Sequence, residues 1–171
     1  SSVAGPKGQK GLASSVAGPK GQKGLAGSQG LAAGVIYTFN QLTDALGSSD
    51  TGLVRFGNTN AGAADKVYIH SVDKAGVNIS NYIESWDQST TTGTRGFLTF
   101  LGSNSSGETD WTELAIFKIN GATVSSGSGS GERYVISVDP VSNGGTIDAG
   151  DSVAVQFLRT GDKGSVGLKG E

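Results

Sequence analysis

"SVAVQFLRTGDKG", residues 152–164, joins two kinds of sequence within thirteen residues. In its first part Val153, Val155 and Phe157 share one side of an extended chain, which predicts a strand with one buried face. From Gly161 onward, glycine instead returns at every third position. The stretch therefore predicts a β-rich domain that ends where a segment with a three-residue glycine period begins.

The same glycine period is found at both ends of the chain. A collagen triple helix requires it, because three extended chains wind together and no side chain fits at their shared axis. The alternative, a flexible linker, predicts irregular glycine spacing and abundant serine, whereas the other positions here hold mostly Pro, Lys, Gln, Leu, Asp and Glu. We therefore expect the chain to form a homotrimer with two further copies of itself. The residues expected at the triple-helix axis are Gly5, Gly8, Gly11, Gly18, Gly21, Gly24, Gly27, Gly30, Gly161, Gly164, Gly167 and Gly170.

The glycine pattern divides the chain into three parts. We expect a collagen-like segment at 1–34, a β-rich trimerising domain (the knob) at 35–160, and a second collagen-like segment at 161–171. The sequence "SSVAGPKGQKGLA" occurs twice in succession, so the period is interrupted near 14–17. Because the chain begins and ends inside a repeat, it is expected to be an excerpt from a longer polypeptide.

Composition excludes several classes of function. Residues 1–34 carry four lysines and no acid, whereas residues 35–160 carry seven basic and thirteen acidic side chains. Binding to nucleic acid requires clustered cations, so we expect no nucleic-acid partner. The chain has no cysteine, which excludes disulfides and thiolate ligands. No stretch approaches the roughly 18 apolar residues that cross a bilayer, so no membrane insertion is expected.

Short apolar runs separated by turn residues fill the middle of the chain, and they predict an all-β fold, an antiparallel sandwich of the jelly-roll kind. "NGAT" (120–123) predicts a hairpin, "SSGSGSG" (125–131) a loop tip, and "SNGGT" (142–146) the next turn. The segment 38–47 fits either a helix or the end of a strand. The strands are expected at 52–57, 66–72, 95–102, 112–119, 132–139 and 152–159.

Two of these strands, 97–101 and 114–119, are apolar on both faces. Such strands are buried on both sides. We expect them to lie between the core and a second layer or a neighbouring subunit.

No catalytic pattern emerges from the polar residues. His70 is the only histidine and alternates within a strand, which favours a structural role. The acidic residues offer oxygen ligands of the kind that Ca²⁺ takes but lack the EF-hand spacing. Nucleotide-binding and nucleophile-elbow motifs are missing, so neither an enzyme nor a cofactor or metal is expected. The acidic candidates form two alternative groups, one of Glu108, Asp110 and Glu113 and the other of Asp148 and Asp151.

Trp86 and Asp87 are the most suggestive pair for a ligand. An exposed indole stacks on sugar rings, whereas a buried one fills the core. Burial is the favoured interpretation, with Asp87 starting the turn "DQSTTTG". Contact of this pair with a glycan is the alternative.

Several stretches of the middle region carry a resemblance: "DTGLVRFGN", "KVYIHSVD", "WDQST", "ELAIFKINGAT" and "FLRTGDKG". The region 34–164 resembles the domain inserted between collagen-like stretches in tail-fibre and related virion structural proteins of tailed phages, cyanophages especially. The resemblance is most specific at Arg55-Phe56, at Tyr68-Ile69, at Trp86-Asp87 with Ser89-Thr90, and at the exit "FLRTGDKG" (157–164). It departs from the pattern at the polar insert 125–131. It implies a structural fibre module in a virion or an extracellular filament.

A binding module is the rival interpretation. In this alternative the knob is an adhesin of a phage fibre or of a bacterial surface collagen-like protein, and it contacts a host cell-surface glycan or protein. The contact surface would then be built from four polar loops: 58–65, 88–95, 103–110 and 125–131.

Overall fold

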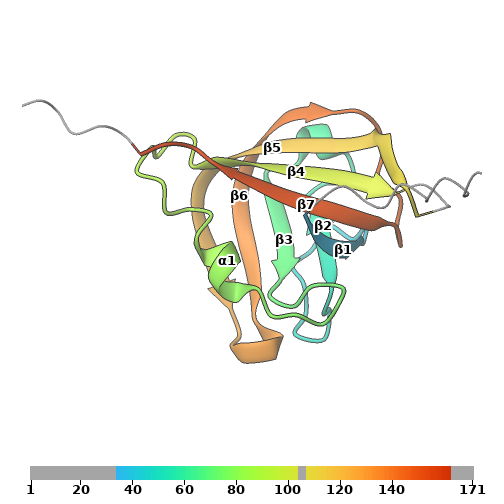
Figure 1. Ribbon diagram of the computed structural model, residues 1–171, viewed down its shortest axis with the longest axis horizontal. Coiled ribbons are helices and arrows are strands. Elements are labelled where there is room, and N and C mark those ends of the chain that lie inside the picture. The colour runs from blue at the N-terminus through green and yellow to red at the C-terminus, as the bar shows by residue number, and fades with distance from the viewer. Residues whose placement is uncertain (1–33, 104–106, 163–171) are drawn as a thin grey trace, which may run out of the picture.

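The computed structural model describes residues 34–103 and 107–162, which form a closed seven-stranded β-barrel (Figure 1). The predicted all-β class is confirmed. One short helix, α1 (Ser80–Glu84), and two 3-10 turns, η1 (Ala61–Ala63) and η2 (Gly129–Gly131), lie between strands. In order around the barrel, the strands are β1 (Val35–Phe39), β2 (Leu53–Phe56), β3 (Lys66–His70), β6 (Arg133–Asn143), β5 (Thr109–Ser126), β4 (Gly96–Ser103) and β7 (Ser152–Arg159).

The expected jelly-roll sandwich is replaced by this barrel because β1 pairs on both sides. It runs antiparallel to β7, with Ile36 opposite Ala154, and parallel to β2, with Thr38 opposite Leu53. Because β1 bonds to β2 on one side and to β7 on the other, the sheet has no unpaired edge strand. Two stacked sheets would keep their edges. The first and last strands of the chain therefore close the barrel.

Residues 38–47 do not form a helix, so the strand alternative holds for the start of this segment. Tyr37 and Phe39 point into the barrel with exposed fractions of 0% and 6%. This two-residue period fits a strand, and β1 ends at Phe39. The loop that follows, 40–52, is fixed to the barrel by Arg55, which is buried in β2 and forms ion pairs with Asp50 (2.9 Å) and Asp44 (3.4 Å).

The hairpin predicted at 120–123 is wrong, since these residues lie inside the long strand β5. They form a bulge: Ile119 pairs with Val138 and Thr123 with Ile136, so two extra residues are accommodated on β5. Gly121 suits this position because a Cβ there would come within 2.9 Å of Ser137 Cβ. The chain reverses at 127–132 instead, which confirms the loop tip predicted at 125–131. The turn predicted at 142–146 falls where β6 ends.

Aromatic side chains fill the interior. Phe56 lies at the centre, with its ring 4.8 Å from Phe39 and 5.0 Å from both Phe100 and Phe117. Edge-to-face contacts of this kind add to the stabilisation that burial provides. The core therefore stabilises the barrel without any disulfide.

The outer face of β4 and β7 is also partly apolar. Phe97 is only half-buried and its cross-strand neighbour Leu158 is 70% exposed. The expected apolar character on both faces of β4 is present. Figure 1 shows no second layer of described chain over this face of β7.

Candidate functional site

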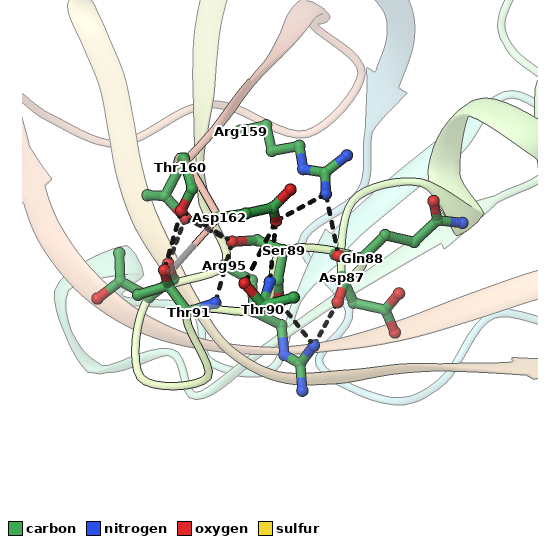
Figure 2. Close-up of polar contacts among 11 residues, drawn as sticks. Asp87, Gln88, Ser89, Thr90, Thr91, Arg95, Arg159, Thr160 and Asp162 are labelled. Atoms are coloured by element: carbon green, nitrogen blue, oxygen red, sulfur yellow. Dashed lines mark hydrogen bonds and ion pairs between the residues drawn. The ribbon is translucent and has the colours of Figure 1, made fainter. Parts of the chain in front are cut away.

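The most developed polar cluster lies where the chain leaves the barrel (Figure 2). The loop between α1 and β4, residues 85–95, wraps the end of β7 and the residues that follow it; we call this segment the exit loop. It is rich in hydroxyl side chains, "STTTGT" at 89–94. These short side chains accept and donate hydrogen bonds close to the backbone, which suits them to hold an extended chain.

Ser89, Thr91 and the Arg95 carbonyl hold the first residues beyond β7. The Ser89 hydroxyl lies 3.1 Å from that of Thr160, and the Thr91 hydroxyl donates to the Gly161 carbonyl at 2.9 Å. The Thr160 backbone N–H donates to the Arg95 carbonyl at 3.2 Å. Because Ser89 is almost fully buried, its contact with Thr160 is shielded from water. The path of the chain up to Gly161 is thereby fixed by the exit loop.

Asp162 is held by charge as well as by hydrogen bonds. Its carboxylate accepts from the Thr90 backbone N–H at 3.1 Å and pairs with Arg159 at 3.0 Å. The hydrogen bond from Thr90 and then the Arg159 guanidinium lower the pKa of Asp162, so it stays ionised near neutral pH. Arg159 also donates to the Gln88 carbonyl at 3.0 Å, which links the end of β7 to the exit loop. We call the contacts between the exit loop and residues 159–162 the exit junction.

The exit loop is itself anchored to the barrel. The Arg95 guanidinium donates to the carbonyls of Asp87 and Ser89, and the Arg95 N–H donates to the Ile119 carbonyl of β5 at 2.9 Å. The Asp87 carboxylate accepts from the Thr123 N–H at 2.7 Å, at the bulge of β5. The junction therefore rests on β4, β5 and β7 together.

Trp86 is buried, with an exposed fraction of 1%, so the favoured interpretation is confirmed. Its ring stacks on Phe157, with centroids 5.5 Å apart, and meets Tyr82 edge to face at 5.4 Å. Both faces of the indole are therefore occupied or enclosed, and a sugar has no open ring face to stack on. Together with the bond from Asp87 to Thr123, this geometry gives the pair a structural role and does not support the glycan contact.

The entry of the chain lies on the same side of the barrel. Val35 pairs with Val155, so Gly34 lies beside Gln156. A Cβ on Gly34 would come within 2.8 Å of the Val155 carbonyl oxygen, so only glycine fits there without displacing β7. The chain thus enters and leaves along the two adjacent strands that close the barrel.

Three of the acidic candidates, drawn from both groups, come together away from the exit loop. Carboxylate oxygens of Glu113, Asp148 and Asp151 lie within 4.8 Å of one another. Partial burial, followed by repulsion from Asp151, raises the pKa of Glu113 to about 7. Oxygen donors of this kind suit Ca²⁺. Asp110 does not join them: it accepts two hydrogen bonds from Thr112, which lower its pKa.

His70 is fully buried, as its strand position suggested. Its Nδ1 accepts from the Val72 N–H at 3.1 Å, and its Nε2 lies 3.4 Å from the Ser48 carbonyl. Both ring nitrogens are thus engaged with backbone, and the residue has a structural role.

The four loops assigned to an adhesin surface do not form one patch. Figure 1 shows the η1 loop, the exit loop and the η2 hairpin at separate places around the barrel. Residues 104–106 of the remaining loop lie outside the described residues. Residues 88–91 of another of these loops already bind residues 159–162 of the chain. A hollow of about 380 Å³ does lie beside η1, lined by Phe39, Phe56, Thr59, Asn60, Ala61, Asn143, Gly145, Thr146 and Ile147.

Comparison with protein-family models, curated proteins and solved structures gives no significant match to this chain. Among the helices in the described ranges, none has the length and apolar character to traverse a membrane. Of the twelve predicted axis glycines, Gly161 is described and the other eleven lie outside the described residues.

The exit junction is the feature that the sequence alone did not reveal. The hydroxyl run at 89–94 and the charges of Arg95, Arg159 and Asp162 were the available signal. The contacts between the exit loop and residues 160–162 join positions about 70 residues apart in the chain, so no local pattern pairs them.

Proposed function

We propose that this chain is a structural module of a fibre. It forms a homotrimer in which triple-helical rods, 1–34 and 161–171, flank a β-rich knob. The resemblance to tail-fibre proteins of tailed phages makes a virion the favoured setting, with a bacterial or other extracellular filament as the alternative. No catalytic activity, cofactor or metal is part of this proposal.

The exit junction is the observation that carries the proposal. Triple helices poor in proline form slowly and must align three chains to within one residue. A folded trimeric domain that holds three chain ends together raises their effective concentration. In this chain the exit loop fixes Thr160, Gly161 and Asp162 at the start of the C-terminal glycine period. A chain end held in this way in each of three copies would favour the start of a triple helix in register.

Substitution of Gly161 by alanine tests this function. In a single barrel no atom lies within 4 Å of the position that a Cβ on Gly161 would take, and the residue has no positive φ. Alanine is therefore harmless in a monomer. At a triple-helix axis it disrupts the packing of three chains. We expect Gly161→Ala to lower the melting temperature of the triple-helical circular dichroism signal of the full chain.

Gly93→Ala is the matched control, since Gly93 is equally open and also lacks a positive φ. It should leave the triple-helical melting temperature unchanged. Equal effects of the two substitutions, or the absence of any triple-helical signal in the parent chain, would contradict the proposed function.

A glycan-binding adhesin is the second candidate, favoured by the hollow beside η1. Asn60 and Asn143 line this hollow together with two threonines and two phenylalanines, and pockets that combine apolar walls with a few polar groups are typical of ligand sites. Glycan-array binding by the full chain that is lost on Asn143→Ala, and retained on Asn120→Ala, would favour this function. Binding that is equal in both variants would exclude this hollow.

A further inference from the structure

We propose that the side of the barrel on which the chain enters and leaves is the surface that docks a second copy of this chain. We call it the exit edge: Gly34, Val35 of β1, residues 155–158 of β7, and Tyr82 of α1. The inference rests on the proposed trimeric function and names the surface through which the knobs would associate.

The first step is the position of the two chain ends. Val35 is opposite Val155, so Gly34 lies beside Gln156, and Thr160 lies four residues beyond Gln156 in the direction of β7. At about 3.3 Å per residue, the entry at Gly34 and the exit at Thr160 are separated by about 13 Å along adjacent antiparallel strands. Both tracts that flank the barrel in sequence therefore connect to one side of it.

The second step is a geometric requirement of the triple helix. Thirty-three residues precede Gly34 and nine follow Asp162, and both segments carry the glycine period. Three chains in a triple helix share one crowded axis. For three copies to bring their entries and exits close to this axis, the side of each barrel that carries them must face the other two copies.

The third step is the chemistry of that side. A groove of about 460 Å³ runs between α1 and the strands β1 and β7. Tyr82, on one wall, is 40% exposed, and Leu158, at the end of β7, is 70% exposed. Aromatic and aliphatic side chains beside a hollow are typical of the buried centre of a protein interface. The groove is lined by Gly34, Val35, Tyr82, Val155, Gln156 and Phe157.

Trp111, the largest exposed apolar side chain among the described residues, lies far from this side of the barrel. It is 69% exposed. It follows Asp110, which pairs with Gly102, whereas Leu158 pairs with Phe97. Five residues of β4, about 16 Å, separate these two levels. Trp111 is thus equally exposed and remote from the exit edge, which makes it a matched control.

Cross-linking tests the docking surface directly, because the chain has no cysteine. Leu158→Cys and Trp111→Cys are made separately in the full chain and treated with a short bis-maleimide at low protein concentration. Near the threefold axis, two Leu158→Cys side chains have a high effective concentration. We expect covalent dimers to form at least about tenfold faster from Leu158→Cys than from Trp111→Cys.

The molar mass of each variant, measured beforehand by sedimentation, separates the possible failures. A trimer in which Leu158→Cys does not cross-link, or cross-links no faster than Trp111→Cys, would overturn the docking surface and leave the fibre function in place. A monomer would overturn both proposals. A trimer with selective cross-linking at position 158 would support them together.

Discussion

A single indole ring, that of Trp86 in the exit loop, packs against the end of β7. It packs between Phe157 and Tyr82 and has an exposed fraction of 1%. Its N–H finds no hydrogen-bond acceptor within the described part of the chain, so packing is its contribution. We expect Trp86→Ala to lower the free energy of unfolding by about 3–5 kcal/mol, as for other buried aromatic residues.

Trp111, the second tryptophan of the chain, provides the control. Because it is 69% exposed, Trp111→Ala should change the free energy of unfolding by less than about 0.5 kcal/mol. Urea denaturation of both variants at one protein concentration measures the difference. Similar values for the two tryptophans would contradict the structural role of Trp86.

Glu113 makes the stability of the barrel depend on pH. Its folded-state pKa of about 7 lies above the ordinary value of 4.5, so the folded state binds the proton more tightly than the unfolded state. The stability contributed by protonated Glu113 is complete below about pH 4.5 and is lost as the pH rises through 7. Glu113→Gln stays neutral and removes this loss.

We therefore expect Glu113→Gln to raise the melting temperature at pH 8 and to leave it nearly unchanged at pH 4.5. Because the side chain is partly exposed and screened by water, the gain at pH 8 should not exceed about 1 kcal/mol. Thermal melts in the presence of a chelator measure this effect without a cation. A variant that is less stable than the parent chain at pH 8 would contradict the assignment.

At the scale of elements, the loop 40–52 depends on one buried cation. The guanidinium of Arg55 is 6% exposed and pairs with Asp50, whose side chain is 27% exposed, and with Asp44, which is 76% exposed. Removing one partner of a buried ion pair leaves an uncompensated charge and costs about 3–5 kcal/mol. We expect Asp50→Ala to approach this cost.

Asp44→Ala removes the exposed partner and should cost at most about 1 kcal/mol. Chemical denaturation of the two variants gives the comparison. If Asp44→Ala were as destabilising as Asp50→Ala, the loop would not be held as the structure shows.

Local alternation predicted most of the strands. Tyr134, Ile136 and Val138 all point inward, as their spacing indicates. The failure at 120–123 is instructive, because Asn-Gly there serves a bulge within one long strand. A hairpin and a bulge need similar backbone freedom, and the choice depends on the partner strand β6, which no local pattern identifies. The barrel in place of the sandwich has the same origin, since closure requires β1 to meet β7 from opposite ends of the domain.

The candidate site was predicted only in part. The sequence indicated where the β-rich region gives way to the glycine period, and the structure places Gly161 at the end of β7 within reach of Thr91. The sequence did not indicate that the exit loop would hold Gly161, because the contacting residues are distant in the chain. The acidic candidates were listed in two groups, and the fold joins Glu113 of one to Asp148 and Asp151 of the other.

At the scale of the whole molecule, the proposed function joins a self-contained barrel to two tracts that would assemble with those of two other copies. The barrel closes without an edge, so edge-to-edge strand pairing cannot assemble copies. In the proposed trimer, association would come from the Gly-X-Y tracts and from side-chain contacts at the exit edge. This division of roles agrees with a chain that has no cysteine to link its copies.

The molar mass of the full chain, followed by sedimentation equilibrium below and above the melting of its triple-helical circular dichroism signal, tests the central claim most directly. We expect three times the chain mass of 17.2 kDa at low temperature, and a fall in mass or a marked weakening of association once the tracts melt. A mass of one chain at every temperature, with no cooperative triple-helical transition, would contradict the account.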